Sequence, residues 1–277
     1  MSVSWLEPEW PVPLGVQSLS TFRSGGVSTA RYASLNLGDH VGDSLQAVGE
    51  NRRRLKAAAG LPAEPAWLTQ VHGTNVIDLD AAADLDGAAV GTVSPANLET
   101  ARTGPVGRAD RGASGPVRPA DAAFTRRRGR VCAILTADCL PIMLAADSGD
   151  LVAAAHAGWR GLAGGVIEAT VQALQVAPER LMAWLGPAIG PEHFEVGAEV
   201  REAFVTGDLG AETAFVPNAR GRFMADLNAL ARRRLAALGV SRIYGGGHCT
   251  YAGEERYFSH RRDGVTGRQA TLIWLEH

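Results

Sequence analysis

Three short apolar runs stand close together in the middle of the chain, at residues 130–135, 142–146 and 151–155. Each has five or six residues, which is the usual length of a β-strand and too short for a typical helix. The breaks between them carry turn residues, Asp138-Cys139-Leu140-Pro141 and then Asp147-Ser148-Gly149-Asp150. Uninterrupted apolar runs of this kind are typical of strands that are covered on both faces. We therefore expect three central strands of one sheet.

The rest of the chain alternates between helix and strand patterns. A helix is expected at 44–59, where Ser44 can cap the first turn and Gly60 and Pro62 follow the end. Two more helices are expected at about 164–175 and 224–238, and four more strands at 16–22, 181–185, 241–244 and 269–275. This alternation predicts a layered α/β (α+β) fold in which sheets pack against helices. We expect one domain over residues 1–277.

One stretch interrupts this pattern. Between about residues 81 and 120 the chain is rich in Gly, Pro, Ala and Ser and has no apolar period. Such a composition cannot bury enough apolar surface to offset the entropy of ordering the chain. We expect a flexible surface insertion at about 83–119.

Charge and cysteine content restrict the class of function. The 27 basic and 29 acidic residues nearly cancel, which disfavours nucleic acid and anionic membranes as partners. The first 15 residues lack the basic start and apolar core of a secretory signal, and no run reaches the roughly 18 apolar residues of a spanning helix. Three cysteines without CxxC spacing fit reduced thiols. These features predict a cytoplasmic protein with small-molecule partners, and they leave the oligomeric state open.

Three side chains stand where predicted strands end and could meet in space: His72, Cys139 and His156. Zinc accepts imidazole and thiolate ligands, and catalytic zinc sites commonly use three protein ligands and keep the fourth position open. Separations of 67 and 17 residues form no local metal motif, so the fold must bring these residues together. The residues by themselves also allow two other interpretations. Cys139 could be a nucleophile with His156 as its base, or all three could be structural.

Motifs along nearly the whole chain resemble the laccase-domain family, also called the multicopper polyphenol oxidase or peptidoglycan-editing family. They are Arg23-Ser24-Gly25-Gly26-Val27-Ser28, Ser34-Leu35-Asn36-Leu37, Asn51-Arg52, Gln70-Val71-His72-Gly73, residues 136–141, residues 156–161, residues 186–190 with Phe194-Glu195-Val196, and residues 258–264. Two departures are visible. The stretch at about 83–119 is longer than the family pattern, and Phe22 replaces the usual threonine before Arg23.

The resemblance implies a fold and an activity. The fold would be a layered sandwich with mixed β-sheets, similar to the catalytic domain of cytotoxic necrotizing toxins. His72, Cys139 and His156 would bind zinc. The activity would be that of a zinc-dependent purine nucleoside phosphorylase that uses phosphate to cleave adenosine, inosine, guanosine or methylthioadenosine, with adenosine deaminase as a side activity.

Several polar residues in these motifs are candidate substrate or catalytic groups. Arg23, Arg160 and Arg261 are candidates for binding phosphate, because a guanidinium can donate two parallel hydrogen bonds to an oxyanion. Asn36 and Gln70 are candidates for the ribose or the base edge, although either could instead satisfy loop backbone groups. We expect Asp138, beside Cys139, to orient a ligating histidine or to transfer a proton.

Two other activities remain as alternatives. A copper-dependent polyphenol oxidase with a multicopper cluster needs many imidazoles, and this chain has seven histidines and no His-x-His pair. Copper could still replace zinc at one His/Cys/His site, since copper(II) binds such ligands more tightly. A cysteine-type amidase that edits a cell-wall precursor would use Cys139 as the nucleophile.

Overall fold

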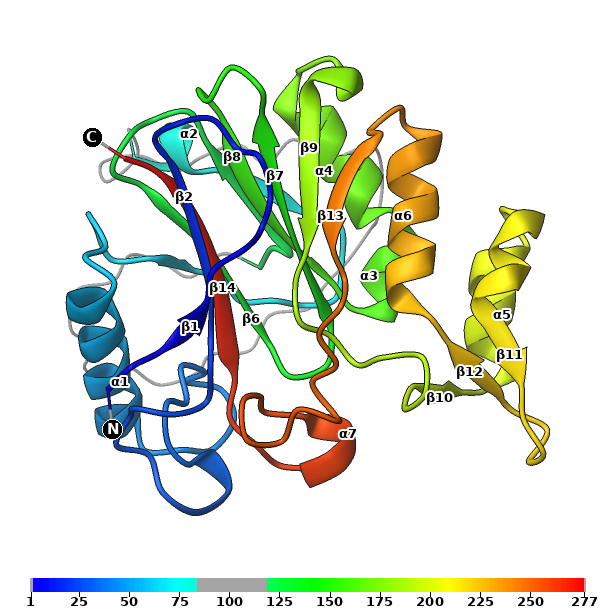
Figure 1. Cartoon of the computed structure of the whole chain (residues 1–277), viewed down its shortest axis with the longest axis horizontal. Coiled ribbons are helices and arrows are strands. Elements are labelled where there is room, and N and C mark those ends of the chain that lie inside the picture. Colours follow the sequence, from blue (N-terminus) through cyan, green and yellow to red (C-terminus); the bar gives the residue numbers. More distant parts are fainter. Residues whose placement is uncertain (1, 84–118, 277) are drawn as a thin grey trace, which may run out of the picture.

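The computed structural model describes residues 2–83 and 119–276. The insertion expected at 83–119 falls almost wholly outside the described residues. Two β-sheets form the centre of the molecule (Figure 1).

The first sheet has five strands, and its neighbours run antiparallel except for the parallel pair β6 and β3. Its strands in spatial order are β1 (Trp5–Leu6), β2 (Val16–Thr21), β14 (Gln269–Leu275), β6 (Val131–Thr136) and β3 (Ala66–Trp67). The closing strand β14 therefore lies in the middle of this sheet.

The second sheet has six strands and is mixed. The pairs at its two edges, β13 with β9 and β5 with β4, are parallel, and the pairs between them are antiparallel. Its strands in spatial order are β13 (Arg242–Gly245), β9 (Leu181–Leu185), β7 (Leu140–Ala146), β8 (Val152–Ala157), β5 (Ala122–Thr125) and β4 (Val76–Asp78).

The two sheets pack face to face, with helices on their outer faces (Figure 1). Alternate residues of facing strands fill the space between the sheets, among them Cys132, Ile134, Met143, Ala154 and Ile273. On the outer face of the six-stranded sheet lie α3 (Trp159–Gly164), α4 (Val166–Leu174) and α6 (Leu227–Ala237). The helix α1 (Leu45–Ala58) packs through Leu55 on the other side of the molecule. The layered sandwich with mixed sheets, predicted above, is confirmed.

A smaller unit extends from this sandwich on the right of Figure 1. It consists of a three-stranded sheet and one helix: β10 (Glu195–Val196), β12 (Phe223–Ala225), β11 (Phe215–Pro217) and α5 (Ala198–Val205). The short helices α2 (Leu79–Ala83) and α7 (His260–Asp263) complete the fold, with 3-10 turns at Ala30–Tyr32, Pro178–Arg180 and Leu209–Ala214.

Two expectations are wrong in detail. The three central runs do not share one sheet, because β6 belongs to the five-stranded sheet while β7 and β8 belong to the six-stranded one. An apolar run that is buried on both faces does not specify its partner, and the corner at Asp138 turns the chain from one sheet into the other. The helix expected at 224–238 starts at Leu227, because residues 223–225 pair as β12 and Asp226 caps the helix by accepting from the Ala229 N–H.

Across residues 2–83 and 119–276, no helix combines the length and the apolar character that crossing a membrane requires.

Candidate metal centre

The three predicted ligands come from two chain crossings and one strand. His72 lies on the link from β3 to β4, and Cys139 lies on the link from β6 to β7, so both stand where the chain passes from one sheet to the other. His156 is the penultimate residue of β8 and is buried. Residues far apart in the sequence therefore meet at one end of the sandwich.

The distances within this group fit a metal ion. The Nε2 atom of His72 is 3.8 Å from the Sγ atom of Cys139. One ligand atom from each of the three residues lies within 4.8 Å of the others. A tetrahedral zinc ion with bonds of ~2.3 Å to sulfur and ~2.0 Å to nitrogen separates such ligand atoms by about 3.5 Å. Small side-chain adjustments would therefore close the site around a metal, and the donor set of two imidazoles and one thiolate suits zinc.

Asp121 holds two of these ligands in place. Its side chain is fully buried, and its Oδ1 atom lies 2.8 Å from the Nδ1 atom of His156. Its two oxygens also accept from the backbone N–H groups of Val71, His72 and Gly73 at 3.2, 2.9 and 2.7 Å. An acceptor at Nδ1 keeps the proton there and leaves Nε2 of His156 free for a metal.

Sequence reasoning missed Asp121 and assigned the partner role to Asp138. Asp138 instead accepts from the Thr250 hydroxyl at 2.6 Å and from the Arg261 N–H at 2.7 Å. These bonds join the loops around the site, and the expected role of Asp138 in orienting a histidine or transferring a proton stays a prediction. A charged residue at the entry to the apolar strand β5 is the signal that could have found Asp121.

At two residues of the site the backbone adopts a conformation that residues other than glycine rarely take. His72 has φ of +59° and Asp138 has φ of +98°. A Cβ atom at Gly158 would lie 2.7 Å from Cδ2 of His72 and 3.0 Å from Sγ of Cys139. Strained backbone of this kind persists only where the surroundings enforce it, and it is common at functional sites.

The electrostatics favour a thiolate. Burial opposes ionisation of Cys139, but the neighbouring charge and hydrogen bonds of His156 and His72 lower the pKa of the thiol to about 6. Burial likewise opposes protonation of His156, while Cys139 and Asp121 raise its pKa to about 9. Burial raises the pKa of Asp121 less than the hydrogen bonds from His156 and the backbone lower it, so this carboxyl stays ionised. Without a metal the centre is thus a thiolate, an imidazolium and a carboxylate in a row.

The side chains of Gln70 and Asn36, the two amide residues predicted to bind substrate, form hydrogen bonds mainly with backbone groups of the protein. Gln70 donates to the Leu135 carbonyl at 2.7 Å and accepts from the Leu135 N–H at 2.8 Å. Asn36 is fully buried and bonds to Gly38, Asp43 and the Arg268 N–H. Their binding to ribose or base stays a prediction, and the structural alternative accounts for the contacts that each one makes.

The three predicted arginines differ in how they are engaged. Arg23 donates to the carbonyls of Ala33 and Glu254, at 3.1 and 3.0 Å. Arg261 donates to the carbonyls of His193 and Glu195. Arg160 is exposed and lies over the Trp159 ring at 4.3 Å, and within the described part of the chain its guanidinium has no hydrogen-bond partner. Arg160 is therefore the one of the three most open to an anion.

The fold and the site together define a mixed α/β sandwich with a candidate three-ligand metal centre. The chain belongs to the family described as multi-copper polyphenol oxidoreductase laccase, whose model matches residues 17–276.

Relatives in several bacteria match over nearly their full length. The chain is 48% identical over 274 residues to a purine nucleoside phosphorylase of Pseudomonas aeruginosa, covering 99% of each chain. It is 47% identical over 268 residues to the purine nucleoside phosphorylase YfiH of Escherichia coli, covering 97% of each. A crystal structure of a Neisseria meningitidis protein matches with a TM-score of 0.84 and 44% identity, covering 99% of each chain.

Proposed function

We propose that this chain is a zinc-dependent purine nucleoside phosphorylase, acting on adenosine, inosine, guanosine or methylthioadenosine, with adenosine deaminase as a side activity. The observation that carries the proposal is the His72, Cys139 and His156 centre in a chain nearly half identical, from end to end, to relatives of that name. The substrates would be a nucleoside and phosphate in the cytoplasm, where the three free cysteines fit a reducing environment.

Zinc is proposed over a multicopper cluster because of the number of ligands. Within residues 2–83 and 119–276, only this group of three or more His, Cys, Asp or Glu side chains brings its ligand atoms close enough to hold a metal ion. Bound by His72, Cys139 and His156, zinc would supply a Lewis acid at an open coordination position.

The residues of the chain then have definable tasks. Phosphorolysis forms a bond between a phosphate oxygen and the anomeric carbon of ribose while the bond from that carbon to the purine nitrogen breaks. The bonding electron pair leaves with the purine, which takes up a proton. Arg160 lies in the first turn of α3, four residues after His156 in the sequence, and its guanidinium would hold the attacking phosphate. Asp121 keeps His156 and the His72 loop in position during this step.

A cysteine-type amidase is the second candidate, and one observation favours it. His156 has the Asp121 carboxylate 2.8 Å from its Nδ1 atom and the Cys139 Sγ atom within 4.8 Å of a ring nitrogen, which matches the order nucleophile, base and orienting carboxylate. The lowered pKa of Cys139 suits a nucleophile as well as it suits a metal ligand.

The deciding experiment measures bound metal and turnover in the same preparations. Purified wild type, His72→Ala and Cys139→Ala would be incubated with adenosine or inosine, with and without phosphate, and free base would be quantified by chromatography. His40→Ala is the matched control, because His40 is an exposed histidine outside the centre.

We expect release of base that depends on phosphate, with loss of both zinc and activity in the two site variants only. Zinc binding without nucleoside turnover would refute the phosphorylase. Amide hydrolysis that survives chelation and is lost in Cys139→Ala would establish the second candidate.

A further inference from the structure

Arg268 directly precedes the closing strand β14, at the end of the sandwich that carries the candidate metal centre. Gln269, the first residue of β14, pairs with Thr136 at the end of β6, and from there the chain continues to Cys139. Burial lowers the pKa of the Arg268 guanidinium, while the charges of Cys139 and Asp138 raise it. A guanidinium keeps its proton in proteins, so Arg268 is a cation within electrostatic range of the metal centre.

The guanidinium of Arg268 is held through one of its three nitrogens. Its Nη1 atom donates to the carbonyls of Thr266 and Gly267, both at 3.0 Å. Across residues 2–83 and 119–276, the Nε and Nη2 atoms have no hydrogen-bond partner, and neither is enclosed by protein. The edge formed by Nε and Nη2 therefore presents two parallel N–H donors, which is the arrangement with which arginine binds an oxyanion.

The loop at residues 36–38 fixes the position of Arg268. Asn36 is fully buried, and its Oδ1 atom accepts from the backbone N–H groups of Arg268 and Gly38, at 2.8 and 3.0 Å. The Arg268 carbonyl accepts from the Leu37 N–H at 3.1 Å. Gly38 lies against the side chain, because a Cβ atom there would be 2.8 Å from Cγ of Arg268. Asn36 thus holds the backbone of Arg268, and Gly38 leaves room for its side chain.

No carboxylate of the described residues forms an ion pair with Arg268, which is partly buried. The nearby carboxylate of Asp138 has other partners, because its oxygens accept from the Thr250 hydroxyl at 2.6 Å and from the Arg261 N–H at 2.7 Å. A charge that is partly removed from water without a counter-ion destabilises the fold. A bound oxyanion would supply the missing partner.

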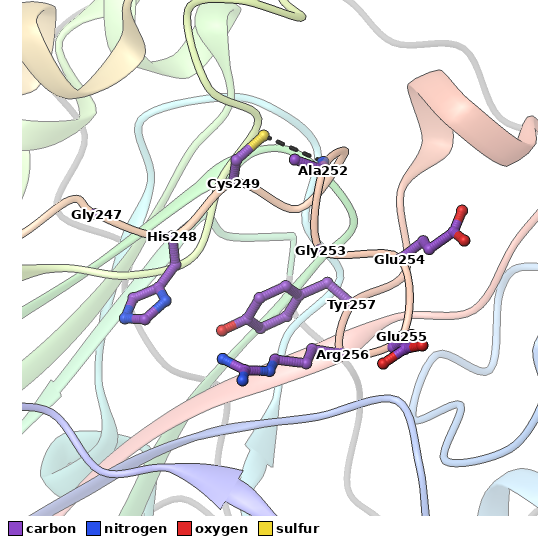
Figure 2. Close-up of a pocket in the computed structure, with 9 residues that line it drawn as sticks. All are labelled: Gly247, His248, Cys249, Ala252, Gly253, Glu254, Glu255, Arg256 and Tyr257. Carbon is purple, nitrogen blue, oxygen red and sulfur yellow. Dashed lines mark hydrogen bonds between the residues drawn. The ribbon is translucent and has the colours of Figure 1, made fainter.

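Arg256 shows how Arg268 differs from an exposed arginine. Figure 2 shows Arg256 lining the open hollow at residues 247–257 together with Glu254 and Glu255, whose carboxylates would repel an anion. The Arg256 guanidinium has no hydrogen-bond partner in the described part of the chain, so binding would have to order a long side chain. Arg268 is already held by two carbonyls, which lowers the entropy cost of binding.

We infer that Arg268 binds the phosphate of the proposed phosphorolysis through its Nε and Nη2 atoms, with Gly38 as a positioning residue for its side chain. The inference rests on the proposed function and adds to it a phosphate-binding residue that lies outside the sequence motifs. The guanidinium holds the oxyanion beside the metal centre and forms no covalent bond with it.

Binding of inorganic phosphate to the full chain tests the inference without turnover. Phosphate would be titrated against the purified protein and followed by phosphorus nuclear magnetic resonance, with circular dichroism as the measure of folding. We expect saturable binding that Arg268→Gln weakens about tenfold or more, because two hydrogen bonds to a charged group are lost. Arg268→Lys keeps the charge without the two parallel donors and should bind with intermediate affinity.

Arg232→Gln is the matched control for the loss of an arginine. Arg232 is also partly buried and donates to two backbone carbonyls, those of Ile243 and Gly245. This variant should bind phosphate as wild type does.

Steady-state kinetics separates phosphate binding from a general loss of structure. Arg268→Gln should raise the KM for phosphate about tenfold or more and leave the KM for inosine unchanged. Gly38→Ala should also raise the KM for phosphate, because the added Cβ atom displaces the Arg268 side chain. The control Gly49→Ala should not, because its added Cβ atom would have no neighbour within 4 Å.

The outcomes distinguish this inference from the proposed function. Folded Arg268→Gln protein with wild-type affinity and KM for phosphate would overturn the role of Arg268 and leave phosphorolysis standing. Phosphate binding that is lost in Arg268→Gln, in a protein that cleaves no nucleoside, would support the anion site and refute phosphorolysis. A wild type that binds no phosphate would overturn both.

Discussion

Asp121 offers the sharpest test of the metal centre, through the substitution Asp121→Asn. The carboxylate accepts four hydrogen bonds, one from His156 and three from consecutive backbone N–H groups. Each of its oxygens accepts two of them. An amide of the same shape has only one oxygen, so its NH₂ group would face two donors and at least two of the bonds would be lost.

The expected loss is specific to metal binding. Replacement of the carboxylate partner of a metal-binding histidine typically costs about 10–100-fold in metal affinity. That range corresponds to roughly 1.4–2.7 kcal/mol. We expect the upper part of this range, because Asp121 supports both His156 and the loop that carries His72.

The assay is competition for zinc with a chromophoric chelator, with circular dichroism as the measure of folding. Asp226→Asn is the control, because Asp226 caps α6 through the Ala229 N–H and an asparagine caps equally well. The control should bind zinc as wild type does. A folded Asp121→Asn protein with wild-type zinc affinity would refute the role given to Asp121.

Three further predictions test the surroundings of the site. Gly158→Ala should weaken zinc binding at least tenfold in the same competition assay, because the added Cβ atom would meet His72 and Cys139. The control Gly164→Ala should leave zinc binding unchanged, because the nearest atom to its added Cβ lies 3.6 Å away. In the metal-free protein, alkylation of Cys139 by iodoacetamide should rise as the pH passes about 6, where the thiol becomes a thiolate, and zinc should suppress it; a midpoint near the ordinary thiol pKa would contradict the ion pair. Arg262→Gln should lower the free energy of unfolding in urea by about 2 kcal/mol, because the guanidinium donates to three backbone carbonyls at 2.8–2.9 Å; an unchanged midpoint would show that these bonds add nothing.

The sequence predicted the bounds of single strands and helices better than it predicted which strands share a sheet. The strands β2, β9 and β14 and the helix α1 lie within a residue or two of their predicted ranges, because apolar spacing and a cap such as Ser44 act over a few residues. The division of the apolar runs between two sheets could not be predicted, since both sheets bury such runs on both faces.

The candidate metal ligands and the residue that supports them differ in how far the sequence predicts them. His72, Cys139 and His156 were predictable because their motifs resemble a known family and their side chains are chemically distinctive. Asp121 was not, because its function comes from burial next to His156, 35 residues away, and no local pattern records that contact. For the arginines the residue type alone did not show their contacts in the fold: Arg23 donates to two backbone carbonyls, and its binding to phosphate stays a prediction.

The crossings at His72 and Cys139 have a consequence for cooperativity. A metal ion held by both residues would tie together two points where the chain leaves one sheet for the other. Any ligand that binds only the folded state adds its binding free energy to stability, and here that energy would oppose separation of the two layers in particular. Zinc affinity and the packing between the sheets are then thermodynamically linked. A cavity between the two sheets, for example from Met143→Ala, would therefore lower the zinc affinity of the metal centre. Zinc affinity would in turn measure changes in the packing between the sheets.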